Sequence, residues 1–161
     1  MKHILLIALT CLGLGASQAA EPKVGAALPA LGGLLPDASL PKTSGKVVLV
    51  DFWASWCAPC KASFITLSRL HQKYSAKGLV IIGIGVDDEA ADHQAFAAKN
   101  KAPFTLVHDS KHKAAEFFNP PTMPSSYLVD RKGVIRHIHK GFKGAKTEAE
   151  YVAEIEALLA E

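Results

Sequence analysis

VVLVDFWASWCAPC, residues 47–60, is a continuous apolar run that leads directly into two cysteines separated by Ala58 and Pro59. Such a run is typical of a strand that helices cover on both faces. Cysteines at positions i and i+3 in the first turn of a helix lie on one face, so a disulfide between Cys57 and Cys60 would need little rearrangement. Pro59 fits this turn because its missing N–H would have no intrahelical partner there. The segment therefore predicts a strand followed by a helix that begins at the cysteines.

Cys57 is expected at or near the N-terminus of this helix, where unpaired backbone N–H groups and the helix dipole favour a thiolate. The thiolate is the form that attacks a disulfide, so Cys57 is the candidate nucleophile. Cys60, one turn further on, should be more buried and should resolve a mixed disulfide by attacking Cys57. The pair predicts thiol-disulfide exchange.

A CxxC pair can also be half of a structural zinc site, or a static disulfide. A zinc site needs a second pair of Cys or His ligands, and the only other cysteine is Cys11. A static staple needs neither a proline between the cysteines nor the aromatic collar of Phe52, Trp53 and Trp56. Redox chemistry is the favoured interpretation of the pair. A static structural disulfide and soft-metal binding stay open as alternatives.

The first residues have the pattern of an export signal. Lys2 precedes an apolar run from Ile4 to Leu14, and small residues follow up to Ala19 and beyond. The run is short for a bilayer-spanning helix, so residues 1–19 are expected to be a cleaved signal peptide, with a retained membrane anchor as the alternative. Cleavage would remove Cys11 and leave only the motif cysteines, as suits an oxidising compartment. We expect the mature protein to reside in the periplasm or cell envelope.

The chain has 161 residues and a formal net charge of +3 at pH 7. A mature length of about 140 residues fits one domain, and the charge gives no reason to expect nucleic acid as a partner. Residues 20–46 are expected to form an irregular N-terminal extension with at most one short hairpin ending near Lys46. Residues 47–161 are expected to form one domain, acting as a monomer.

Hydrophobic periodicity predicts alternating strands and helices in this domain. The expected strands are 47–53, 79–86, 104–108, 126–130 and 134–139, and the expected helices are 58–76, 87–99, 111–118 and 147–159. The second helix would carry Asp87, Asp88 and Glu89 in its first turn, where the dipole favours acidic groups. Parallel βαβ units followed by an antiparallel hairpin predict an α/β fold with a mixed central sheet flanked by helices.

VDFWASWCAPCK resembles the active-site segment of thioredoxin-fold proteins, and Met123-Pro124 before SSYLVD resembles their cis-proline loop. The export signal, ASWCAPC, VDDEAADHQAFAAKNKAPF and SYLVDRKGVIRHIHKGF are most similar to the TlpA/ResA group of exported thioredoxin-like proteins. The resemblance covers essentially residues 24–159. It implies a thioredoxin fold with the group's N-terminal extension and central insert, and a thiol-disulfide oxidoreductase.

Members of this group mostly act as reductants of protein disulfides, often on apocytochrome c or on copper-centre assembly proteins. They are re-reduced by a membrane thiol electron donor of the CcdA/DsbD type. The resemblance therefore implies a disulfide-containing protein substrate and such a donor as partners. No cofactor is expected beyond the redox-active disulfide of Cys57 and Cys60.

The resemblance also assigns a substrate-binding loop. Pro120, Pro121 and Pro124 are equal candidates from the residues alone, and the family pattern selects Pro124. Its peptide bond with Met123 is implied to be cis, which would leave a Met123 backbone group free to pair with an extended polypeptide. The residues expected to contact the substrate are Trp56, Pro59, Met123 and Pro124.

Asp51 lies mid-strand among apolar neighbours, where a carboxylate is costly unless it is paired or neutral. The matching aspartate of thioredoxins exchanges a proton with the buried cysteine, so the resemblance implies this role for Asp51 toward Cys60. Burial should raise the pKa of Asp51 toward the range that suits acid–base work. The alternative is a solvated position at a polar edge.

Three positions depart from the family pattern. Gly83 stands where thioredoxins have the lysine partner of that aspartate. Ser63 stands where ResA-like proteins have a glutamate, and Ile65 where a helix-kinking proline is expected. These differences predict proton handling closer to thioredoxin than to ResA, and a straighter helix.

Four histidines form a second candidate cluster. His137 and His139 share one face of an expected strand, while His108 and His112 flank a loop and a short helix. A metal site would require them to converge, and alternating histidines on an edge strand are more often surface residues. No metal is therefore expected.

Three rival functions stay open: a copper-binding chaperone that uses Cys57 and Cys60, a disulfide oxidant, and a peroxidase. The peroxiredoxin pattern calls for a proline seven residues before the reactive cysteine, where Val50 stands. The proline between the cysteines resembles reducing members of the superfamily more than strong oxidants. A reductant is the preferred prediction.

Overall fold

The structure is a computed structural model that describes residues 22–36 and 38–161. The predicted signal, residues 1–19, and Cys11 lie outside the described residues. In the described part of the chain, no helix is both long enough and apolar enough to cross a bilayer.

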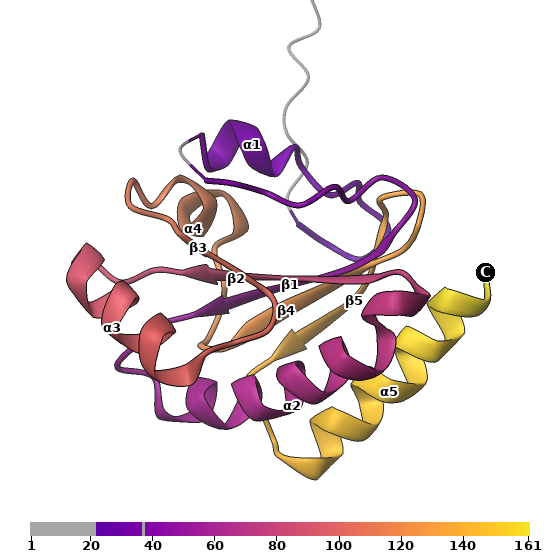
Figure 1. The fold of residues 1–161 in the computed structure, drawn as a ribbon. Helices are drawn as coiled ribbons and strands as arrows, with labels where there is room; N and C mark the ends of the chain where they lie inside the picture. The colour runs from indigo at the N-terminus through magenta and orange to yellow at the C-terminus, as the bar shows by residue number, and fades with distance from the viewer. Residues whose placement is uncertain (1–21, 37) are drawn as a thin grey trace, which may run out of the picture.

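Five strands form one mixed sheet in the spatial order β3-β2-β1-β4-β5 (Figure 1). The strands are β1 Val47–Trp53, β2 Leu79–Gly85, β3 Thr105–His108, β4 Ser125–Val129 and β5 Ile135–Lys140. β2 runs parallel to both β1 and β3, whereas β4 runs antiparallel to both β1 and β5. The mixed sheet expected from the sequence is confirmed, with β1 at its centre and buried along its whole length.

Helices cover both faces of the sheet (Figure 1). They are α1 Leu31–Leu34, α2 Ala58–Tyr74, α3 Ala90–Asn100, α4 Lys113–Phe118 and α5 Ala145–Ala160, with a 3-10 turn, η1 Ser75–Lys77, directly after α2. In Figure 1, α2 and α5 lie below the sheet with α3 toward one side, while α1 and α4 lie above it. This is the helix–sheet–helix arrangement of a thioredoxin fold.

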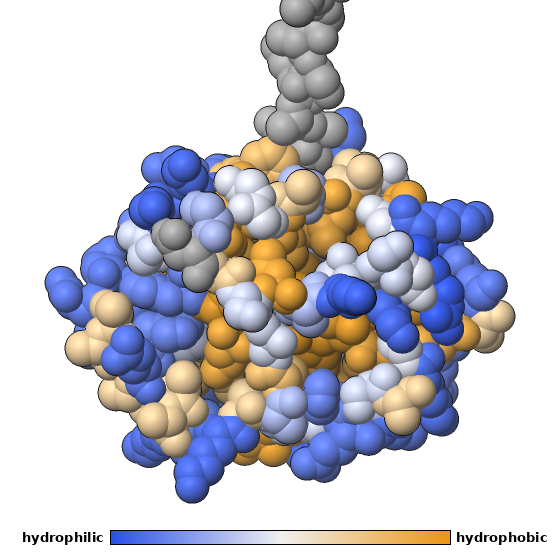
Figure 2. Space-filling view, turned by 45° about the horizontal axis from the view of Figure 1, so that its top comes forward, coloured by the Kyte–Doolittle hydropathy of each residue, from blue (hydrophilic) through white to orange (hydrophobic). Residues whose placement is uncertain are grey.

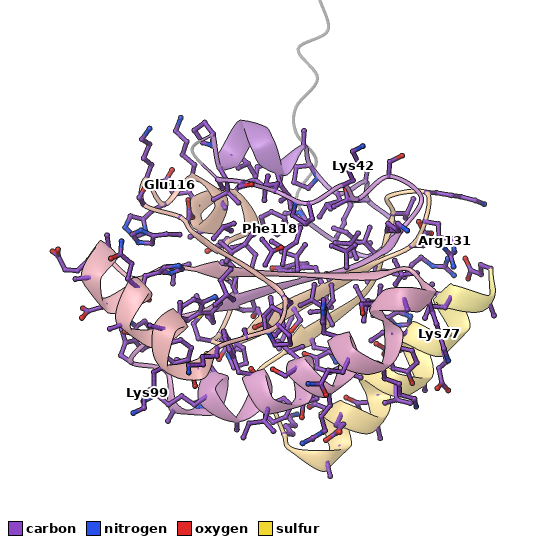
Figure 3. The ribbon with its side chains drawn as sticks, viewed as in Figure 1. Lys42, Lys77, Lys99, Glu116, Phe118 and Arg131 are labelled. Atoms are coloured by element: carbon purple, nitrogen blue, oxygen red, sulfur yellow. A yellow bond between two sulfur atoms is a disulfide. The ribbon has the colours of Figure 1, made fainter. Side chains whose placement is uncertain are left out.

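Residues of β1 alternate between two apolar layers, as the period of a strand requires. Leu49 and Trp53 belong to the layer that contains the apolar side chains of α2 and α5. Val50 and Phe52 belong to the layer beneath α1 and α4. Figure 3 shows Phe118 between α4 and the sheet, and its ring lies 5.0 Å from that of Phe52. The strand therefore has no solvent-facing side.

The N-terminal extension packs on the face of the sheet that carries α4. Gly25 N donates to Ile135 O at 2.8 Å, and Ile135 N donates to Ala26 O at 2.9 Å. Leu31 and Leu35, one helical turn apart, are both buried against the sheet. Residues 22–36 and 38–46 form no hairpin before Lys46, because burying this pair of leucines favours one helical turn.

The extension and the sheet border an apolar hollow. Figure 2 brings the upper side of the molecule forward and shows apolar side chains at the centre of this face, ringed by polar ones. Apolar side chains from the extension and from the sheet line this hollow, among them Leu28, Leu31, Leu40, Val48, Ile82 and Val129.

The second helix expected from the sequence begins later than predicted. α3 starts at Ala90, and Glu89 is its N-cap residue. Asp87 is buried before the helix, and its Oδ1 accepts a hydrogen bond from Ser55 N at 2.9 Å. The expectation of a first turn containing Asp87, Asp88 and Glu89 is therefore wrong, because the Asp87 carboxyl group caps a backbone donor in the loop after β1.

Two glycines of β2 make room for large side chains. A Cβ atom at Gly83 would lie 2.7 Å from Leu106 Cδ2 and 3.1 Å from Trp53 Nε1. A Cβ atom at Gly85 would clash with His93 Nδ1 and would lie 2.9 Å from Trp53 Cζ2. A β-carbon does not fit this close to its neighbours, so both positions exclude larger residues unless Leu106, Trp53 or His93 moves.

Gly85→Ala is expected to lower the free energy of unfolding by about 1–3 kcal/mol, the usual cost of overpacking a core. Urea denaturation of the oxidised protein measures this. Gly33→Ala is the matched control, because no atom lies within 4 Å of its added methyl group. Equal denaturation midpoints for the two variants would contradict the packing described for Trp53 and His93.

Candidate active site

The two motif cysteines lie at the N-terminus of α2. Cys57 is the N-cap residue, and Cys60 lies in the first turn. Their sulfur atoms form a disulfide, with the Cα atoms 5.3 Å apart. Cys60 N donates to Cys57 Sγ at 3.2 Å. When the disulfide is open, the free N–H groups of this turn favour negative charge on the Cys57 sulfur.

The cysteines differ in burial, as expected. Cys60 is fully buried, whereas Cys57 keeps a small exposed area beside Trp56, whose side chain is 70% exposed. Ala58 and Pro59 are also exposed. A reactant approaching from solvent therefore meets Cys57 first.

The predicted substrate loop and the cysteines lie at the same end of the sheet, next to the C-terminal end of β1. Of the three loop prolines, Pro124 has the cis peptide bond that the family pattern implied, with Met123. Phe52 pairs with Ser125 across β1 and β4, which places Pro124 beside the chain that leaves β1 toward Cys57. Pro124 O accepts from Gly141 N at 2.8 Å, and Met123 packs against the apolar layer that contains both cysteines.

Asp51 lies on the face of β1 that points toward α2, in line with Leu49 and Trp53. Its side chain is fully buried. Oδ1 accepts a hydrogen bond from Ser126 Oγ at 2.6 Å, and Oδ2 has no partner in the described part of the chain. Burial raises the pKa of Asp51 to about 7, although the Ser126 hydrogen bond opposes the rise. The raised pKa is as expected, and the solvated alternative is wrong.

The position of the thioredoxin lysine is filled differently in this chain. Gly83 pairs with Asp51 across β1 and β2, and the Trp53 indole occupies the space beside it. The Trp53 ring is in turn stacked on His93 at 4.9 Å and packs against Phe96 at 4.5 Å. Among the residues that the structure describes, no cation lowers the pKa of Asp51. An aromatic stack therefore replaces a charged partner.

The other two departures lie on α2. Ser63 is buried and donates from Oγ to Cys60 O at 2.9 Å, so it binds the helix backbone. Ile65 is 62% exposed. The helix runs without a break through both positions.

The candidate histidines do not converge. His137 Nδ1 and His139 Nε2 lie 3.2 Å and 2.7 Å from the two carboxyl oxygens of Glu154 on α5. His108 belongs to β3 and His112 follows it, at the opposite edge of the sheet from β5. In residues 22–36 and 38–161, no group of three His, Cys, Asp or Glu side chains could hold a metal ion.

Two residues that the sequence analysis missed contact the Asp51 site. Ser126 Oγ lies 2.6 Å from both Asp51 Oδ1 and Tyr151 OH. Ser126 and Tyr151 are both buried. A serine inside a buried strand beyond Pro124 was a signal that a polar partner must lie nearby, but the sequence could not identify that partner.

The chain belongs to the AhpC/TSA family, whose profile matches residues 28–138. Thioredoxin-like protein YneN of Bacillus subtilis is 35% identical over 105 residues, which cover 64% of this chain and 61% of that protein. Sporulation thiol-disulfide oxidoreductase A of the same organism is 28% identical, with 95% and 98% covered. The chain spans 50–64% of the length of relatives named thiol-disulfide oxidoreductase ResA.

Solved structures agree with this placement. A crystal structure described as a thiol:disulfide interchange protein DsbE from Chlorobium tepidum superposes with a TM-score of 0.70 at 35% identity, covering 73% of this chain and 82% of that one. The thioredoxin fold and the resemblance to the TlpA/ResA group are confirmed. The names of these relatives support the class predicted from the sequence, thiol-disulfide oxidoreductase.

Proposed function

We propose that this protein reduces disulfides in protein substrates through the Cys57/Cys60 dithiol. The observation that carries the proposal is the closed disulfide at the N-terminus of α2, with Cys57 next to solvent and Cys60 fully buried. Asp51, buried on the face of β1 that points toward α2, supplies a group that can take up a proton near neutral pH.

The reaction proceeds in two exchanges. The Cys57 thiolate attacks one sulfur of the substrate disulfide, forms a mixed disulfide and releases the first substrate thiolate. Cys60 then loses its thiol proton to the Asp51 carboxylate, and its sulfur attacks Cys57 Sγ. The mixed disulfide breaks, the second substrate thiolate leaves, and the Cys57–Cys60 disulfide closes. Two electrons pass from the dithiol to the substrate, and an external dithiol must return them.

Purified reduced protein tests this activity directly. With dithiothreitol as electron source, it is expected to accelerate the reduction of insulin above the rate of dithiothreitol alone. Equilibration with glutathione then decides the direction: a potential near those of reducing thioredoxins supports a reductant, and one near those of strong oxidants supports the oxidant alternative. An insulin reduction rate equal to the background would overturn the proposal.

Substrate contact is proposed for Trp56, Pro59, Met123 and Pro124. The exposed Trp56 ring supplies apolar area beside Cys57, and the cis loop lies at the same edge of the sheet. An extended segment of the substrate would pair with the Met123 backbone, which forms no hydrogen bond within the described residues.

Trp56→Ala is expected to raise KM for a protein disulfide about fivefold or more, as loss of an aromatic anchor does. The rate with a small aromatic disulfide should stay unchanged, because that reactant needs little surface. Ile65→Ala is the control, since Ile65 is also apolar and 62% exposed but lies two turns along α2. An equal change in KM for both variants would remove Trp56 from the binding surface.

The residue pattern of the N-terminus and the similarity to the TlpA/ResA group support a proposal for the location and partners of this protein. We infer residence in the cell envelope after export by residues 1–19, as a monomer. Re-reduction is assigned to a membrane thiol donor of the CcdA/DsbD type, and the pathway to cytochrome c maturation or related thiol maintenance. A Cys60→Ser variant expressed in its native compartment should trap substrates as mixed disulfides through Cys57. Recovery of the variant only from the cytoplasm would contradict the location.

Two assays separate the rival functions. Tight stoichiometric Cu(I) binding by the reduced protein, without insulin reduction, would favour a copper chaperone. Consumption of hydrogen peroxide at a catalytic rate would favour a peroxidase. Val50 stands at the peroxiredoxin proline position and is paired on both sides within the central strand, with Ile82 and Tyr127. A proline has no N–H and cannot complete such pairing. The strand at Val50 therefore differs from the peroxiredoxin pattern, which has a proline at this position.

A further inference from the structure

The hydrogen bonds of Ser126 define the direction of a buried proton chain. Ser126 Oγ donates to Asp51 Oδ1 at 2.6 Å. A serine hydroxyl has one proton to donate, so when Asp51 is ionised and accepts that proton, the donor at the second contact of 2.6 Å is Tyr151 OH. Two hydroxyl groups in series therefore point toward one carboxylate oxygen.

All three members of this chain lie in the layer that contains the cysteines. Asp51 alternates with Leu49 and Trp53 on β1, and Ser126 lies on the same face of β4 as Leu128. Tyr151 projects from α5 into that layer and is fully buried. The chain therefore occupies the dry space behind α2, where hydrogen bonds to a charge are strong.

We propose that Ser126 and Tyr151 are positioning residues that set the protonation of Asp51 and thereby the pH at which Cys60 becomes a nucleophile. This inference rests on the proposed function. The hydroxyl pair stabilises the Asp51 carboxylate where thioredoxins use a lysine, a position that Gly83 occupies here. Because Ser126 engages Oδ1, the proton from Cys60 is received by Oδ2, which has no partner among the described residues.

Among the described residues, the other charged groups that act on this hydrogen-bond chain do so at Tyr151. Glu150 and Glu154 lie on α5 itself, and burial together with the Asp51 charge raises the pKa of Tyr151 above its usual value. From β5, the His139 ring packs edge-on against the Tyr151 ring at 4.6 Å, and His139 is itself held by Glu154. Tyr151 therefore stays protonated and serves as a hydrogen-bond donor.

Titration of Asp51 in the oxidised protein, followed by NMR of carboxyl-labelled aspartate, tests the inference without any substrate. Wild-type Asp51 is expected to titrate near neutral pH. Ser126→Ala should move the midpoint upward by about one pH unit or more, the worth of a hydrogen bond to a charged group. Tyr151→Phe should move it upward by less, and it keeps the ring packing if Ser126→Ala fails to fold. Ser126→Thr, which restores the hydroxyl, should return the midpoint toward the wild-type value.

Matched controls lie on the same strand. Ser125→Ala removes a buried hydroxyl that binds Thr122 O at 2.7 Å instead. Tyr127→Phe removes one that binds Phe118 O at 3.3 Å in the opposite layer. Neither should move the Asp51 midpoint. In single turnovers, the closing of a Cys57 mixed disulfide by Cys60 should show its pH profile displaced with the Asp51 midpoint, and for Ser126→Ala it should be about fivefold slower at pH 7.

An unchanged Asp51 midpoint in both Ser126→Ala and Tyr151→Phe would overturn the inference and leave the proposed function intact. A wild-type protein that does not reduce insulin would overturn the proposed function instead. The titration shift would still report whether the hydroxyl chain controls Asp51, so the two failures are distinguishable.

Discussion

Cys57→Ser is expected to reduce insulin no faster than the external dithiol alone. A serine hydroxyl is not ionised at neutral pH and is a poor nucleophile toward sulfur, so neither the helix dipole nor the exposure of position 57 can rescue the first exchange. Cys57 is the N-cap residue and contacts Cys60 N through its sulfur. Serine is a favoured N-cap residue, so the variant should fold and isolate the chemical loss.

Cys60→Ser is the matched variant and should behave differently. It retains the attacking sulfur, so it should form a stable adduct with a substrate disulfide but should not release it. Mass spectrometry of the two variants after exposure to insulin distinguishes them: an adduct for Cys60→Ser and none for Cys57→Ser. The reverse result would exchange the roles assigned to the two cysteines.

Asp51→Asn is expected to remove a large pH dependence from the stability of the oxidised protein. The pKa of Asp51 is raised from 3.8 to about 7 in the folded state. Below about pH 4 the group is neutral in both states, and its contribution to stability is fully present. Between pH 4 and 7 the unfolded chain loses this proton while the folded protein keeps it, so stability falls by up to about 4 kcal/mol.

Urea denaturation from pH 4.5 to pH 8 measures this effect. The difference in unfolding free energy, Asp51→Asn minus wild type, should rise with pH and level off above the Asp51 midpoint. Constant costs of the substitution, such as an unpaired amide N–H, cancel in this slope. Ser63→Ala, which also removes a buried hydrogen bond near the cysteines, should show no such slope. Parallel curves for Asp51→Asn and wild type would contradict the raised pKa.

Local sequence pattern accounts for the part of the site that was predicted. The apolar run of β1, the cysteine spacing and Pro59 all act within one strand and one helical turn, so Cys57 and Cys60 lie where expected. The family pattern added the cis bond at Pro124. Burial of Asp51 also followed from its neighbours on the strand.

The missed features depend on contacts between distant segments. Asp87 binds Ser55 across 32 residues, so its role as a loop cap is invisible in the periodicity of α3. Ser126 lies 75 residues from Asp51, and the partner hydroxyl comes from α5. No local rule links these positions, and only the packing of β1, β4 and α5 brings them together.

In the proposed reaction, the Cys57/Cys60 dithiol transfers two electrons to a protein disulfide. The most direct test mixes fully reduced protein with a stoichiometric amount of insulin, without any other reductant, and maps the disulfides by mass spectrometry. For each substrate disulfide that is lost, one Cys57–Cys60 disulfide is expected to form, with no added cofactor. Cysteines that stay reduced while insulin keeps all its disulfides would contradict it.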